Sequence, residues 1–77
     1  MSNLSKIETL RQAREVLLGM EERQEIRAEL DEWAVTIEKH NDGEFSASFA
    51  DMETGVISLL DASQILLEHG DHDLYVD

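Results

Sequence analysis

The sequence predicts an α+β domain in which two N-terminal helices, a three-stranded antiparallel meander and a C-terminal helix follow in the order α-α-β-β-β-α. Apolar residues recur at helical spacing early in the chain and alternate with polar residues in the middle. An Asn-Asp-Gly sequence, a strong hairpin signal, stands between two alternating segments. A chain of 77 residues has room for one core, so we expect residues 1–77 to form a single domain.

The first helix is predicted over about residues 5–18. Its apolar residues recur every three or four positions, with polar residues on the opposite face. Ser5 and Glu8 fit the capping box Ser-x-x-Glu, with Ser5 at the N-cap. Gly19 follows the last apolar residue and is expected to end this helix.

A second helix is predicted over about residues 20–32. A straight continuation of the first helix would place Ile26, Leu30 and Trp33 on its polar side, whereas a new helix with its own phase removes the conflict. Trp33 is in phase with the apolar residues on both sides of it. We therefore expect Trp33 to be a core residue.

Three strands are predicted next, at about 33–39, 44–50 and 56–59. The first two alternate apolar and polar residues and are joined by the turn sequence at 41–43. A last helix is expected at about 61–69, with Asp61 as its cap. The tail at 71–77 is acidic, but Leu74, Tyr75 and Val76 suggest that it docks onto the rest of the protein.

The composition favours a folded protein of a reducing compartment. Leu, Ile, Val and Phe make up 21 of the 77 residues, above the roughly 20% below which highly charged chains stay disordered. Without Cys, the chain has no disulfide and no thiolate metal site. Because it shows no signal peptide and no apolar run of about 18 residues, we expect a soluble cytoplasmic protein.

The negative charge is segregated along the chain. Residues 1–27 hold five acids and five bases, whereas residues 28–77 hold thirteen acids and the single base Lys39, so the net charge of −12 belongs to the second part. Such a surface repels nucleic acids and anionic membranes and attracts basic protein surfaces. The alternative is that the acidity serves solubility alone.

No enzyme signature is present. The chain lacks a phosphate-binding glycine loop, a dinucleotide fingerprint and a zinc-protease motif. The acidic cluster around His69 and His72 has the composition of a metal site but lacks the spaced ligands that zinc sites use. We therefore expect no catalytic activity, no cofactor and no metal.

Two sets of carboxylates are candidates for a partner-binding surface. On the predicted second helix, four glutamates would share one stripe, with like charges one turn apart that cost the helix about 0.2–0.5 kcal/mol each. Their spacing of about 6 Å along the axis is comparable with that of phosphates on a nucleic-acid strand. The alternative is a merely solvated, Glu-rich helix. The stripe consists of Glu21, Glu25, Glu29 and Glu32. The second set, near the hairpin and the following turn, consists of Glu38, Asp42, Glu44, Asp51 and Glu53.

In its size, acidity, mixture of helix and strand and lack of catalytic motifs, the chain resembles the small phage-encoded antagonists of bacterial defence, such as anti-CRISPR and anti-restriction proteins. The resemblance is one of overall character across the whole chain, and no diagnostic motif carries it. It implies a non-catalytic inhibitor, in the host cytoplasm if phage-encoded, that occupies a basic nucleic-acid-binding channel. Carboxylates would then stand in for phosphates.

The expected function is therefore inhibition by nucleic-acid mimicry, with a basic protein as partner and no direct binding of nucleic acid or membrane. An antitoxin, an immunity protein or an assembly partner of a basic protein is the first alternative. A homo-oligomeric accessory protein is the second, with Leu18, Leu67 or Tyr75 as contacts. The chain would be a monomer or a small homo-oligomer.

Overall fold

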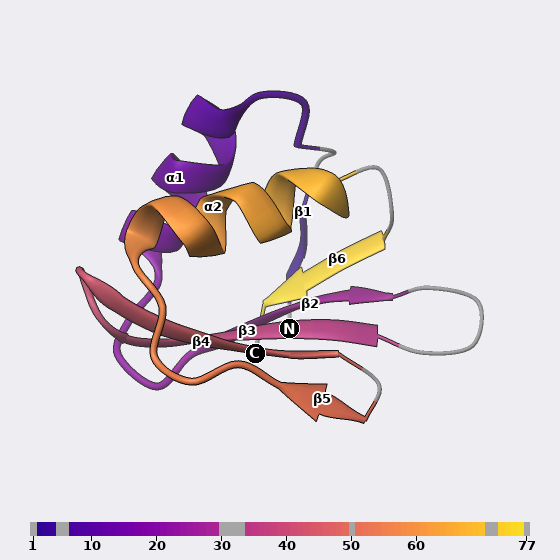
Figure 1. Ribbon diagram of the computed structural model, residues 1–77. Helices are drawn as coiled ribbons and strands as arrows, with labels where there is room; N and C mark the ends of the chain where they lie inside the picture. The colour runs from indigo at the N-terminus through magenta and orange to yellow at the C-terminus, as the bar shows by residue number, and fades with distance from the viewer. Residues whose placement is uncertain (1, 5–6, 30–33, 50, 71–72, 77) are drawn as a thin grey trace.

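The computed structural model describes residues 2–4, 7–29, 34–49, 51–70 and 73–76. Within these residues the chain forms two helices and a six-stranded antiparallel sheet of strand order β1-β6-β2-β3-β4-β5, with both helices on one face of the sheet (Figure 1). The elements in chain order are β1 (Ser2–Leu4), α1 (Leu10–Gly19), β2 (Glu25–Glu29), β3 (Ala34–Asn41), β4 (Glu44–Phe49), β5 (Met52–Glu53), α2 (Leu59–Glu68) and β6 (Asp73–Val76).

The predicted order α-α-β-β-β-α is wrong, because strand β2 occupies the segment predicted as the second helix at 20–32. In β2 the charged residues alternate with the buried residues Ile26 and Ala28, which is the period of a strand with one buried face. Residues 30–33, including Trp33, lie outside the described residues, so the predicted core role of Trp33 stays a prediction.

The core lies between the sheet and the helices. The inward-facing residues of β2, β3 and β4 are in register, as in the pairs Ile26–Ile37 and Ile37–Ala47, so they form a continuous apolar surface under the helices. The helices contribute residues from one face each. The buried core consists of Ile7, Ala13, Leu17, Met20, Ile26, Ala28, Val35, Ile37, Phe45, Ala47, Ala62, Leu66 and Leu74.

The segment predicted as an acidic tail at 71–77 contains an interior strand. β6 pairs with β1 on one side and with β2 on the other, so that Leu74 is opposite Leu4 and Ala28. Leu74 is fully buried. The chain end is thus part of the sheet, and the sheet brings β1 and β6 from the two ends of the chain side by side.

Both helices begin at residues other than the predicted caps. Thr9 is the N-cap of α1, because its hydroxyl accepts from Gln12 N at 3.2 Å while the Gln12 side chain accepts from Thr9 N. This box replaces the predicted one at Ser5, which is outside the described residues. Ser58 caps α2 by accepting from Asp61 N, so the prediction of Asp61 as N-cap is wrong by one turn.

The third predicted strand, at 56–59, is also wrong. Residues 56–59 contain only a single bridge, between Ile57 and Phe45, and the short edge strand β5 lies before them, at Met52–Glu53. Ser58 already caps the helix, and capping leaves no room for further strand pairing. The predicted strands at 33–39 and 44–50 correspond to β3 and β4.

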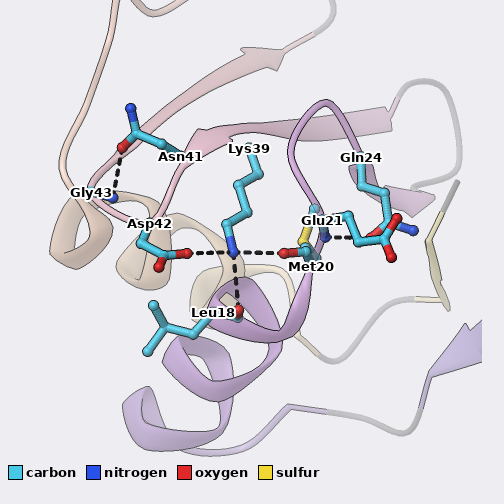
Figure 2. A network of polar contacts seen from close by, with 8 residues as sticks. All are labelled: Leu18, Met20, Glu21, Gln24, Lys39, Asn41, Asp42 and Gly43. Carbon is cyan, nitrogen blue, oxygen red and sulfur yellow. Dashed lines mark hydrogen bonds and ion pairs between the residues drawn. The ribbon is translucent and has the colours of Figure 1, made fainter.

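Lys39 ties the β3–β4 hairpin to the end of α1 (Figure 2). Although Lys39 is only 2% exposed, its Nζ donates to the carbonyl oxygens of Leu18 at 3.0 Å and of Met20 at 2.6 Å. The same Nζ lies 3.0 Å from Asp42 Oδ1. Lys39 thus satisfies carbonyls at the negative end of the helix and directs its charge away from the outer face of the sheet.

Candidate interaction surface

The face of the sheet opposite the helices carries the polar side chains that alternate with the core residues of β2 to β5. We call this surface the acidic face. Its described members are Glu25, Arg27, Glu29, Thr36, Glu38, Ser46, Ser48 and Glu53. Successive strands place all of them except Glu29 in two rows. One row runs Glu25–Glu38–Ser46, and the other runs Arg27–Thr36–Ser48–Glu53.

Two glutamates are directly opposite each other on neighbouring strands. Glu25 is the register partner of Glu38. Since Lys39 N donates to Gln24 O at 3.0 Å, and hydrogen-bonded pairs alternate along an antiparallel ladder, Glu25 and Glu38 occupy a non-hydrogen-bonded pair. In such pairs the side chains come closest, and like charges directly opposite destabilise the sheet. Stability alone would favour a base or a neutral residue at one of the two positions.

A shallow depression of about 220 Å³ opens beside this pair. Its lining combines three carboxylates with the hydroxyl groups of β3 and β4, and no Lys or Arg is among the described residues that line it. Its lining residues are Glu25, Thr36, Glu38, Ser46, Ala47, Ser48, Glu53 and Thr54. Arg27 lies on the same face, where its Nε is 3.2 Å from Glu29 Oε1.

This arrangement suits the binding of cationic side chains. Carboxylates accept charge-assisted hydrogen bonds from guanidinium and ammonium groups, and hydroxyls either donate or accept. At the edge of the depression, His40 Nε2 is 2.9 Å from Ser46 Oγ. In the described part of the chain, no group of three or more His, Asp or Glu residues is arranged to hold a metal ion.

The predicted helical stripe of carboxylates does not exist. Glu21 lies in the turn before β2, where its N–H donates to the Gln24 side chain at 2.7 Å. Glu25 and Glu29 stand at the two ends of β2, and the two-residue period of the strand brings both to the acidic face. Glu32 is outside the described residues. The prediction of this stripe was wrong because the residues lie on a strand and not on a helix.

The second predicted set is divided among three places. Glu38 and Glu53 line the depression, together with Glu25 from the first set. Asp42 and Glu44 are at the hairpin tip, where Asp42 pairs with Lys39 and Glu44 accepts from Asn41 Nδ2 at 2.6 Å. Asp51 is exposed in the turn between β4 and β5.

The hydroxyl-bearing part of the depression was missed. Thr36, Ser46 and Ser48 alternate with the core residues of the predicted hairpin, so the alternation itself indicates that all three share the face opposite the core. The predicted hairpin already implied this grouping, but the predicted binding surface was defined by charge and therefore left out neutral side chains.

No protein-family model, curated protein or solved structure matches the chain. Among the described residues, neither helix has the length and apolar character needed to cross a membrane.

Proposed function

We propose that the protein is a non-catalytic binding protein whose acidic face occupies the basic, nucleic-acid-binding site of another protein. The observation that supports it best is the in-register pair of Glu25 and Glu38 beside a depression that Glu53 also lines. This pair disfavours the fold, so a gain in binding is the physical reason we assign to it. The net charge of −12 would steer the encounter with a basic partner.

The sheet gives this face the properties of a docking platform. Glu25 and Glu38 sit on neighbouring strands about 4.8 Å apart, and Glu53 is two strands beyond Glu38. The core and both helices support the opposite side of the same strands. The carboxylates are therefore held on a firm surface, which lowers the entropy lost when a partner binds.

The partner class we favour is a bacterial defence complex or nuclease, in the cytoplasm, because the chain is similar in character to phage-encoded antagonists of such systems. The carboxylates of the acidic face would take the place of phosphates. An antitoxin, immunity or assembly partner would use the same acidic face without competing with nucleic acid. Competition is therefore the property that separates these functions.

The test compares two double charge reversals that change the net charge equally. Glu38→Lys with Glu53→Lys alters the acidic face, and Glu8→Lys with Glu68→Lys alters exposed positions near the helices. Tagged wild-type protein and both variants are used to capture partners from a bacterial lysate, with identification by mass spectrometry. We expect one basic protein to be retained by the wild type and the control and lost by the acidic-face variant.

The captured protein is then offered its own nucleic acid. The proposal expects the nucleic acid to displace the wild-type protein. Stable ternary binding would identify an assembly or immunity function instead. Retention of the partner by the acidic-face variant would overturn the assignment of this surface.

A further inference from the structure

A second surface with different chemistry lies between the two helices. A groove of about 350 Å³, which we call the helix groove, is lined by Leu10, Arg11 and Arg14 of α1 and by Leu60 and Ser63 of α2. Both helices cover the same face of the sheet (Figure 1), so the helix groove belongs to the helical layer and not to the acidic face. Its volume is within the range of about 300–1,000 Å³ typical of ligand sites.

The walls of the helix groove are formed by two exposed leucines, at positions where the fold does not require an apolar side chain. Leu10 is 37% exposed and Leu60 is 56% exposed. Leu60 is in the first turn of α2, where an acidic residue would interact favourably with the helix dipole. The polar group at the floor is the hydroxyl of Ser63, and it already has a hydrogen-bond partner, because Ser63 Oγ donates to the Leu59 carbonyl at 2.7 Å. The helix groove thus offers aliphatic contact with no buried hydrogen-bonding group to satisfy.

The rim of the helix groove is basic, in a chain of net charge −12. Arg14 forms no ion pair within the described residues. Arg11 has a single 3.6 Å contact with Glu15, and both side chains are exposed, so this pair contributes little and leaves the guanidinium accessible. Two arginines beside two leucines are complementary to a carboxylate next to an aliphatic side chain.

We propose that the helix groove binds an acidic, aliphatic segment of a partner protein, with the aliphatic side chain between Leu10 and Leu60 and the carboxylates on Arg11 and Arg14. A basic segment would be repelled by these arginines. A second copy of the chain would be repelled at low salt through its whole net charge of −12, whereas a short acidic segment brings only the few carboxylates that the arginines can pair with. The two surfaces are opposite in sign, so the protein would contact basic and acidic partner segments at different sites.

The test is a titration of the isotope-labelled protein followed by NMR amide shifts. The probes are three short synthetic peptides of equal length, built from Leu and Glu, from Leu and Lys, and from Ser and Glu. We expect only the Leu-Glu peptide to shift the amides of residues 10–14 and 60–63. No shift by the Leu-Glu peptide up to about 1 mM, or equal shifts by all three peptides, would overturn the proposal.

Matched variants assign the contacts. Leu60→Asp should weaken binding of the Leu-Glu peptide by about tenfold, because it removes the apolar wall and adds a like charge. The control Val56→Asp makes a similar change at a residue that is 65% exposed outside the helix groove, and it should leave binding unchanged. Arg14→Gln should weaken binding about fivefold, whereas Arg23→Gln, in the turn before β2, should not. Equal losses in a variant and its control would contradict the assignment.

Two measurements separate this proposal from its alternatives. Sedimentation velocity should give a monomer at low salt, and a dimer whose formation shifts the same amides would show that a second copy fills the helix groove. Because Leu60→Asp leaves the acidic face unchanged, it should keep the basic partner. Failure of one proposal therefore leaves the other intact.

Discussion

Lys39 places its ammonium group 2.6 Å from the carbonyl oxygen of Met20, immediately after the end of α1. A base buried to this extent is rare unless its donors are satisfied, and Lys39 meets this condition with two carbonyls and the carboxylate of Asp42. The contact joins the hairpin of the sheet to the helical layer through a polar side chain (Figure 2).

Lys39→Met is expected to lower the free energy of unfolding by about 2–4 kcal/mol, because it leaves the carbonyls of Leu18 and Met20 without their donor. Asp42→Asn removes the remaining partner, but the Asp42 side chain is 83% exposed. Asp42→Asn should therefore lower the free energy of unfolding by less than about 1 kcal/mol. Urea denaturation of both variants measures the difference, and equal losses would mean that the ion pair, and not the helix end, holds Lys39.

Gly70→Ala should destabilise the protein strongly. Gly70 O accepts from Ile7 N at 3.0 Å, and a Cβ at Gly70 would overlap the Ile7 carbonyl oxygen and lie 2.9 Å from Ile7 Cβ. One of the two backbone segments would have to move, at a cost we estimate at about 2–3 kcal/mol. The control is Gly19→Ala, where nothing lies within 4 Å, and it should raise stability by about 0.5–1 kcal/mol. Thermal denaturation of both variants is the measurement.

The fold was predictable from the sequence where local signals agree. The alternation on both sides of Asn41-Asp42-Gly43 predicts the β3–β4 hairpin, and the Asn41 side chain accepts from Gly43 N within the turn. The signals conflict in β2, where Glu and Arg favour a helix but Ile26 and Ala28 follow a two-residue period. Pairing with β3 and β6 decides the conflict, and pairing between distant segments is not visible in a local pattern.

The C-terminal strand β6 is a second segment whose structure depends on pairing between distant parts of the chain. β6 has four residues, of which Leu74 is fully buried, and it lies in an acidic segment of the sequence. Leu74, Tyr75 and Val76 suggest that the segment docks, but no local pattern identifies so short a segment as a strand. Its place between β1 and β2 depends on pairing with both neighbours. For the candidate site, the sequence placed Glu25 in one predicted set of carboxylates and Glu38 and Glu53 in another, because the grouping followed the assumed helix. The structure instead joins Glu25 to Glu38 and Glu53 across the sheet.

The start of α2 gives a prediction that separates two capping schemes. Ser58→Ala should cost about 1 kcal/mol, because it removes the acceptor for Asp61 N. Asp61→Ala should cost only about 0.3–1 kcal/mol, since Asp61 acts through its charge in the first turn. Chemical denaturation measures both. A larger loss for Asp61→Ala than for Ser58→Ala would return the cap to Asp61.

Glu38→Gln should stabilise the fold by about 0.2–1 kcal/mol, because it removes the like-charge pair with Glu25 while keeping the size of the side chain. Glu22→Gln removes one exposed charge in the turn before β2, where no strand pairing is present, and should change stability by less. The shift in melting temperature at low salt is compared for the two variants. An equal shift would show that the total charge, and not the pair, limits stability.

The last prediction concerns the salt dependence of partner binding. If the acidic face docks on a basic protein, the association rate of the wild type should fall steeply as the Debye length shortens from about 10 Å at 0.1 M salt to about 3 Å at 1 M. Stopped-flow measurements with the captured partner give this slope.

Glu38→Lys with Glu53→Lys should flatten that slope and slow association at low salt. Glu8→Lys with Glu68→Lys changes the total charge equally, so it should slow association only slightly. The two variants have the same net charge but differ in where the charge was changed. The comparison therefore tests whether the position of the charge matters, since steering depends on the field at the docking surface. Parallel slopes for the two variants would mean that the net charge of −12 attracts the partner without using the acidic face.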